Sequence, residues 1–432
     1  MTSVGPGSEC SNNVLISGMF DMLNFGDLMF PVVAAHELGL RGYQVQALSP
    51  TGATINLKQA VPSRPVWSAL DPGRSFAGIL IGGGYIVHTH RMDTMMEYRG
   101  QGIGAAVAPS VWLGSTLAAA LRDVPIAWNA PGVPHPLRPR VEVLAAAAFA
   151  AADYLSLRDA GSARMANVPT ATIVPDPILG LDRVWPRDGL VDDFFRLCAQ
   201  LGLDRQDRIL AVHVRQRSLG GEPIPSFVNG LAAACRSLDL TPVLIGLGTA
   251  HADDRIAREL AATLRDRGVW AVALDRPEGL RDVAALLAHA RAYVGSSLHG
   301  YIAATAYGVP GLLVARPAYR KFDGLVAHLE RPQDLLNNWD AALAALPRAL
   351  AAPSPALPKA TSEQLRYHWD NIAAAFAAGP TPNRPARLRF AALAFNTGLE
   401  RDGPNWAIAP FTTAKERAAA LDGADVREME PF

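Results

Sequence analysis

A histidine lies two residues after a serine pair in the segment VGSSLHGYIAATAYGVPGLLV, residues 294–314. The segment predicts a short strand, a helix cap at Ser296 and Ser297, and a helix that follows them. Unpaired backbone N–H groups and the helix dipole attract phosphate or carboxylate to such a helix start. His299 would stand in the first turn, where an imidazole can exchange a proton with a bound molecule near pH 7. A core histidine bonded to a backbone carbonyl is an equally good interpretation of this segment alone.

A second candidate segment is GMFDMLNFGDLMFPVVAAHEL, residues 18–38, in which a strand leads through a glycine-containing loop into a helix. Asp27 stands where the helix begins, so a structural role as the helix cap explains the local sequence. In the functional interpretation Asn24, Gly26 and Asp27 lie at the carboxyl edge of the strand. There the carboxylate could accept sugar hydroxyls or act as a base.

Three glycines follow a predicted strand in ILIGGGYIVH, residues 79–88, and would let the backbone approach a ligand closely. A plain tight turn explains Gly83 and Gly84 equally well. His88 and His90 have the spacing of a metal-binding pair on a strand, but no carboxylate-rich partner segment stands out. We therefore expect histidines at a surface or cleft edge and no metal.

Cationic side chains come directly after two other predicted strands. Arg215 and Arg217 end the strand in AVHVRQRS, and Arg320 and Lys321 stand in YRKFDGLVAHLE. Guanidinium groups at a strand end suit phosphate or carboxylate binding. Solvated arginines and an ordinary charged helix start are the structural alternatives.

The elements that must position these residues form an α/β pattern, because short apolar runs alternate with longer helical ones. The pattern predicts two Rossmann-like domains facing a cleft, at 12–185 and 190–352, with 360–432 as a helix packing back on the first domain plus an irregular tail. Ligands of such folds bind where the carboxyl ends of the strands meet. The predicted strands are 13–17, 44–48, 77–82, 125–129, 153–157, 171–175, 208–214, 241–248, 269–274, 292–295 and 311–314. The predicted helices are 27–40, 108–121, 139–151, 225–237, 252–267, 279–290, 298–307 and 361–378.

The composition excludes several classes of protein. Lys plus Arg and Asp plus Glu both number 40 in 432 residues, so charge gives no reason to expect nucleic acid as a partner. Cys10, Cys198 and Cys235 lie far apart, which predicts neither a disulfide framework nor a zinc site. The sequence contains no signal-peptide pattern and no long apolar run, so we expect no membrane span and a cytoplasmic location. The oligomeric state stays open.

The order of these motifs resembles that of the polysaccharide pyruvyl transferase family. The resemblance covers residues 13–330, and the motifs are specific as a set although each alone is weak. In chain order they are NFGD (24–27), GGG (82–84), WNAPG (128–132), SLRD (156–159), VPDP (174–177), the strand that ends at Arg215, SSLHG with GVP (296–300 and 308–310), and KFD (321–323).

The resemblance implies a glycosyltransferase-B-like fold and transfer of a pyruvyl group from phosphoenolpyruvate to two hydroxyls of a sugar or glycan, commonly in exopolysaccharide or cell-wall assembly. It also implies that His299 and Arg215 serve donor binding and catalysis. Many members carry an arginine immediately before LHG, where this chain has Ser297. A missing guanidinium removes a contact worth about 1.5–3 kcal/mol. Either Arg217, Arg320, Lys321 or Arg215 compensates, or the donor is a different molecule.

We expect His299 to act as a general acid and Asp27 to orient or deprotonate the acceptor once domain closure brings the halves together. Phosphoenolpyruvate would be a co-substrate, with no other cofactor. Two alternatives are a glycosyl or other group transferase with a nucleotide-activated donor and a non-catalytic binding partner in a biosynthetic pathway. The expected donor-binding residues are Arg215, Arg217, Ser296, Ser297, Gly300, Arg320 and Lys321. The expected acceptor-side residues are Asn24, Gly26, Gly83, Gly84, His88 and Asn129.

Overall fold

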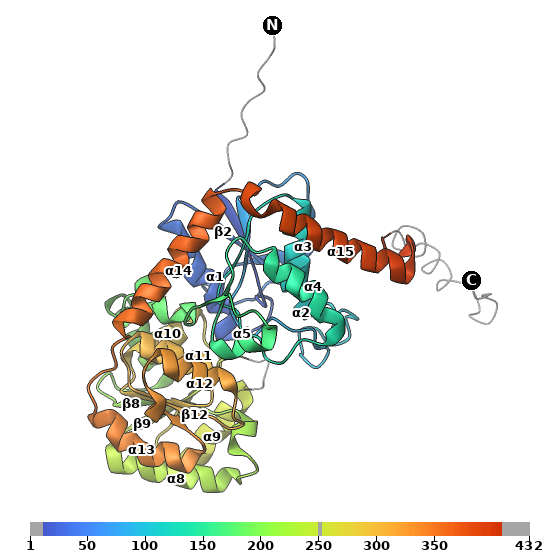
Figure 1. Cartoon of the computed structure of the whole chain (residues 1–432). Coiled ribbons are helices and arrows are strands. Elements are labelled where there is room, and N and C mark those ends of the chain that lie inside the picture. The colour runs from blue at the N-terminus through green and yellow to red at the C-terminus, as the bar shows by residue number, and fades with distance from the viewer. Residues whose placement is uncertain (1–11, 249–252, 408–432) are drawn as a thin grey trace, which may run out of the picture.

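The computed structural model describes residues 12–248 and 253–407, which form two parallel sheets with helices on both faces (Figure 1). The first sheet has the strand order β3-β2-β1-β4-β5, and every pair in it is parallel. Buried apolar residues fill its central strands, as expected of a sheet covered on both faces. Its strands are β1 (Asn13–Ser17), β2 (Gln44–Ser49), β3 (Ser63–Pro65), β4 (Gly78–Ile81) and β5 (Ile126–Trp128).

The second sheet repeats this order as β10-β9-β8-β11-β12-β13, again with parallel pairs only. In each sheet the first strand in the chain lies inside the sheet, with the next strands added on one side of it and the later strands on the other. This strand order is the Rossmann arrangement. The strands are β8 (Ile209–His213), β9 (Thr241–Ile245), β10 (Val272–Leu274), β11 (Ala292–Gly295), β12 (Gly311–Val314) and β13 (Leu335–Leu336). The short strands β6 (Ser156–Leu157) and β7 (Thr172–Ile173) extend the first sheet beyond β5 through an isolated bridge between Ala127 and Tyr154.

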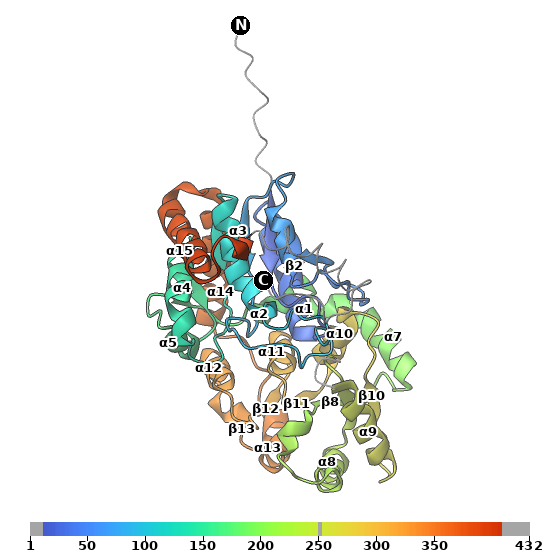
Figure 2. The same ribbon diagram turned by 90° about the vertical axis from the view of Figure 1, so that its right-hand side faces the viewer.

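The helices cover both sheets (Figure 2). Those that accompany the first sheet and the crossover are α1 (Phe25–Gly39), α2 (Val107–Pro109), α3 (Ser115–Leu121), α4 (Pro139–Ala150), α5 (Ala160–Ala166) and α6 (Leu181–Val184). Those that accompany the second are α7 (Val191–Leu201), α8 (Ile224–Leu238), α9 (Asp253–Arg265), α10 (Leu280–His289), α11 (Leu298–Ala306), α12 (Arg320–His328) and α13 (Trp339–Ala351). The chain then returns through α14 (Lys359–Ala377) and α15 (Arg384–Asp402). Two Rossmann-like domains that face a cleft are the glycosyltransferase-B-like fold expected from the sequence.

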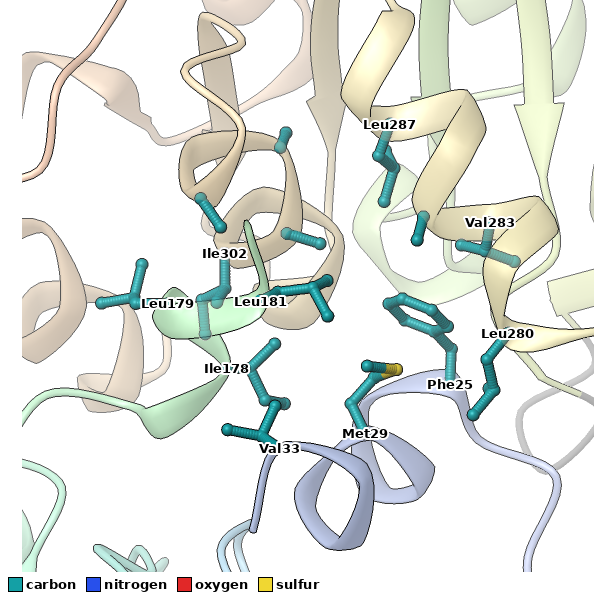
Figure 3. Close-up of a cluster of buried hydrophobic side chains, with 14 of the residues drawn as sticks. Phe25, Met29, Val33, Ile178, Leu179, Leu181, Leu280, Val283, Leu287 and Ile302 are labelled. Atoms are coloured by element: carbon teal, nitrogen blue, oxygen red, sulfur yellow. The ribbon is translucent and has the colours of Figure 1, made fainter. Parts of the chain in front are cut away.

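An apolar seam joins the two halves of the molecule (Figure 3). Phe25, Met29 and Val33 of α1 meet side chains of the crossover segment and of two helices from the second half. Those partners are Ile178, Leu179, Leu181, Leu280, Val283, Leu287 and Ile302. The backbone N–H of Phe25 also donates to the carbonyl of Leu247 at 2.8 Å. Since the seam continues the hydrophobic core across the halves, it holds them as one packed body.

Each predicted strand overlaps a strand of the structure, although only the last two residues of the predicted strand 153–157 belong to one. The structure adds β3, β13 and regular structure near the C-terminus. Helix α14 packs against β5 and α1, and α15 lies across α3 and α4, as the red segment of Figure 1 shows. The expected irregular tail is therefore helical up to Asp402. The rest of that expectation concerns residues 408–432, which lie outside the described part of the chain. No helix of the described residues is long and apolar enough to cross a membrane.

Candidate active site

A pocket of about 800 Å³ lies where the two halves meet. It is placed at the carboxyl ends of β1, β4, β8 and β11, which are the strands beside the reversal of order in each sheet. Both halves therefore supply residues to one site, as the strand order of an open α/β sheet dictates. The residues treated below that line it are Asn24, Asp27, Tyr85, His88, Arg158, Arg215, Arg217, Ser297, His299, Arg320 and Lys321.

His299 occupies the first turn of α11, as predicted. The hydroxyl of Ser297 caps this helix and accepts from the backbone N–H of Gly300 at 3.3 Å. The imidazole meets Phe30 edge-on, and its Nε2 lies 3.8 Å from Asp176 Oδ2. Burial, together with the nearby cations, holds the pKa of His299 well below its ordinary value of 6.5. The imidazole of the ligand-free site is therefore neutral at pH 7.

Gly26 leaves the space that the imidazole fills. A Cβ added at Gly26 would lie 1.8 Å from His299 Nδ1, so Gly26→Ala is expected to push the ring out of its position. We expect a changed ring-proton shift for His299 in the NMR spectrum and a large loss of activity. Gly39→Ala on the same helix is the matched control, because a Cβ there meets no atom within 4 Å. An unchanged His299 signal in Gly26→Ala would contradict the assigned packing.

Asp27 is available to the pocket because a different residue caps α1. The side chain of Asn24 is the cap and accepts from the backbone N–H of Gly26 at 3.1 Å, so the interpretation of Asp27 as the cap is wrong. Burial raises the pKa of Asp27 to about 7, against the opposing effect of Lys321, Arg215 and Arg158. At neutral pH this carboxyl group therefore holds its proton for a large part of the time.

Three cations surround these two groups, of which Arg158 is buried and Arg215 and Lys321 are half-buried. Burial, together with repulsion from Arg215 and Arg158, lowers the pKa of Lys321 to about 7. The Lys321 Nζ lies 5.3 Å from the centre of the Tyr85 ring, which stabilises it as a cation. Burial also lowers the pKa of Arg215, whose guanidinium forms no ion pair within the part of the chain that the structure describes. A concentration of like charge in a buried site favours an anionic ligand.

Arg158 and Asp176 belong to the site although sequence reasoning assigned them no role. Arg158 Nη1 lies 3.7 Å from Asp176 Oδ2, and its guanidinium stands 4.9 Å from the centre of the Tyr85 ring. Both residues follow the two-residue strands β6 and β7, whose carboxyl ends point to the pocket. Their motifs SLRD and VPDP, each directly after a predicted strand, were the signal that could have identified them.

Several buried polar atoms of the site have no hydrogen-bond partner among the described residues. They are Arg158 Nε and Nη2, Asp176 Oδ2, Arg215 Nε and His299 Nε2. Buried polar atoms are normally paired, and an unpaired one costs about 1–3 kcal/mol. Such atoms gathered in one pocket indicate a site built for a polar ligand.

The other predicted residues divide into two sets. Arg217, Arg320, Ser297, His88 and Asn24 line the pocket. The remaining predicted residues contact other residues of the protein. Ser296 accepts a hydrogen bond from the Arg215 N–H at 3.0 Å, and Asn129 accepts one from His368 at 2.8 Å. Gly300 faces Tyr293, Gly83 faces Phe30, and Gly84, with a φ of +93°, faces Asp27. Their proposed ligand contacts stay predictions. Across residues 12–248 and 253–407 no three His, Cys, Asp or Glu side chains are grouped to hold a metal.

Comparison with known proteins identifies relatives of this fold and sequence. A family model described as polysaccharide pyruvyl transferase matches residues 24–317. Curated proteins include no match to the chain. The UDP-GlcNAc 2-epimerase of Methanocaldococcus jannaschii is similar in structure, with a TM-score of 0.50, 11% identity and coverage of 82% of this chain and 97% of that one. The UDP-GlcNAc 2-epimerase of Neisseria meningitidis gives a TM-score of 0.48, 9% identity and coverage of 84% and 99%. At these identities the likeness concerns the fold alone.

Proposed function

Since the chain belongs to the polysaccharide pyruvyl transferase family, we propose that this transferase moves the pyruvyl group of phosphoenolpyruvate to two hydroxyls of a sugar or glycan, which forms a ketal. The observation that carries the proposal is the group of cations Arg158, Arg215 and Lys321 that line the pocket around His299. Phosphoenolpyruvate presents a phosphate and a carboxylate, the two anions that guanidinium groups bind best. The supply of this donor is cytoplasmic, so we place the reaction in that compartment.

Arg158 supplies the charge that Ser297 does not. The family often has an arginine immediately before LHG, and here that position is the helix cap. Arg158 reaches the same pocket from β6 with two unpaired nitrogens, Nε and Nη2. In the proposal Arg158 and Arg215 bind phosphate and carboxylate, and Lys321 completes the set. The cap at Ser297 adds the backbone N–H groups of the start of α11.

The sequence suggests His299 as the general acid and Asp27 as the base, but the directions of their pKa shifts favour the opposite assignment. The pKa of Asp27 is raised to about 7, whereas that of His299 is held well below 6.5. Two titratable groups pushed apart in this way commonly serve as the acid and the base. Asp27 therefore protonates the methylene carbon of phosphoenolpyruvate, and neutral His299 accepts the proton of the attacking hydroxyl. An anionic donor would raise the pKa of Asp27 further and so keep its acid form.

The reaction balances without another reactant. A proton adds to the methylene carbon, which becomes a methyl group, and the first sugar hydroxyl attacks the adjacent carbon as its own proton leaves. The bond from that carbon to the phosphate oxygen then breaks, and the second hydroxyl attacks the same carbon. The products are the ketal and phosphate. Of the two hydroxyl protons, one restores the acid and the other leaves with phosphate.

Titration of the purified chain with phosphoenolpyruvate tests the donor. We expect binding at pH 6 that weakens by at least about tenfold at pH 8, because loss of the protons of Asp27 and Lys321 makes the site less positive as pH rises through about 7. Incubation with an acceptor should release phosphate and add one pyruvyl group to the acceptor, which mass spectrometry detects. Binding of nucleotide sugars in place of phosphoenolpyruvate would refute the proposed donor. Affinity that rises towards pH 8 would refute the assigned charges.

A further inference from the structure

Part of the pocket lining is apolar and rich in methionine. Met19 and Met22 come from the loop after β1, and Met92 and Met95 come from the segment after the three glycines. Four of the nine methionines in the chain therefore lie in one pocket. We call these four residues the methionine wall.

Buried hydrogen bonds hold the methionine wall in place. Asp21, between Met19 and Met22, accepts from the hydroxyl of Tyr98 at 2.6 Å, and this tyrosine closes the segment that carries Met92 and Met95. Thr51 donates to the same carboxylate through its N–H at 2.8 Å and its hydroxyl at 2.6 Å. Asp21 and Tyr98 are both buried. These hydrogen bonds thus fix the positions of the two segments that carry the methionine wall.

Imidazole rings line the same pocket as the methionine wall. They belong to His88, His90 and His135, and the rings of His90 and His135 meet edge-on with their centres 5.1 Å apart. Burial, together with the two histidine neighbours, lowers the pKa of His88 to about 4, so this ring is neutral at pH 7. The proposed partners of the anionic donor are the cations Arg158, Arg215 and Lys321 of the same pocket. The methionine wall therefore suits an uncharged group of the second substrate.

We propose that the acceptor is a sugar linked to a flat, carbon-rich aglycone, and that this aglycone lies against the methionine wall. The inference rests on the proposed pyruvyl transfer, of which it specifies the acceptor class. Methionine side chains adapt to flat ligands, and thioethers make favourable contacts with aromatic rings. A purely polar glycan would instead place hydroxyl groups against side chains that cannot pair with them, which is costly. The cations of the pocket would then hold the donor beside the sugar hydroxyls.

Calorimetric titration of the full chain with paired methyl and phenyl glycosides tests the inference. The pairs are the glycosides of glucose, galactose, mannose and N-acetylglucosamine. We expect the phenyl compound of at least one sugar to bind about tenfold or more tightly than its methyl partner, because the ring is removed from water. Equal affinity within every pair, or no binding of any phenyl glycoside, would overturn the inference.

Variants of Met95 test whether the preference for phenyl glycosides comes from the methionine wall or from apolar binding elsewhere on the protein. Met95→Gln keeps the length of the side chain and is expected to reduce the phenyl-to-methyl affinity ratio towards 1, whereas Met95→Leu retains most of it. Met96→Gln is the matched control, since Met96 is 63% exposed and does not line the pocket. A ratio that Met95→Gln leaves unchanged would contradict the inference. The titration measures binding and needs no turnover. If the protein binds phenyl glycosides selectively but does not consume phosphoenolpyruvate, the proposed donor is refuted and the acceptor inference stands.

Discussion

Replacement of His299 by glutamine is expected to lower kcat at saturating phosphoenolpyruvate by about 10²–10⁴-fold, the usual contribution of a positioned proton-transfer group. Glutamine fills a similar volume beside Phe30 and Gly26, but it cannot accept the proton of the attacking hydroxyl. Steady-state kinetics of phosphate release measure the effect. The dissociation constant of the donor should change far less, because the imidazole is neutral in the ligand-free site.

His36→Gln is the matched control for this substitution, since His36 lies on α1 outside the pocket. Asp27→Asn distinguishes the two proton roles. If Asp27 is the acid, its replacement lowers kcat at every pH and leaves in the profile of kcat/KM only the loss near pH 7 that Lys321 causes. Full pyruvyl transfer by His299→Gln would remove His299 from the mechanism.

Arg215→Gln is expected to weaken phosphoenolpyruvate binding by about 10–150-fold, which corresponds to the loss of one charge-assisted contact of about 1.5–3 kcal/mol. Nε of Arg215 has no partner among the described residues, so the substitution breaks no side-chain bond at that atom. Titration at pH 6 measures the affinity, and the melting temperature reports whether the fold is intact. Arg215→Lys should restore part of the affinity, because it retains the charge without the planar fork.

Arg276→Gln serves as the control for Arg215→Gln. Arg276 is exposed and lies outside the pocket, so its charge is screened from the site. An equal loss of affinity in both variants would indicate long-range attraction of the donor and contradict direct contact by Arg215. An unchanged affinity in Arg215→Gln would exclude the residue from donor binding.

The fold could be predicted from the sequence because buried parallel strands are short apolar runs that end in glycine or a polar residue. Those same ends predicted that Asp27, Arg215 and His299 share one site. Arg158 and Asp176 also follow predicted strands, at 153–157 and 171–175, but the strands that form there, β6 and β7, contain only two residues each. A residue that follows such a short strand has no periodicity to show which way its side chain points.

Other features depend on contacts between distant parts of the chain. Asn129 accepts from His368 of α14 at 2.8 Å, and Arg387 of α15 pairs with Asp153 at 2.6 Å. Neither partner is near in sequence, so no local pattern could reveal these bonds. Helix α15 also begins in a proline- and arginine-rich stretch, which masks its pattern. The buried Arg387 meets Asp153 only once the first sheet is in place.

The apolar seam of Figure 3 bears on the expectation that domain closure assembles the site. Asp27, Arg215 and His299, which come from both halves, line one pocket above this seam. The seam also limits recombination between relatives. A chimaera that takes one half from another member of the family must bring matching partners for Phe25, Met29 and Val33. Otherwise the mismatched seam would leave cavities or clashes beneath the site, and the hybrid would lose the alignment of Asp27 and His299 together with its stability.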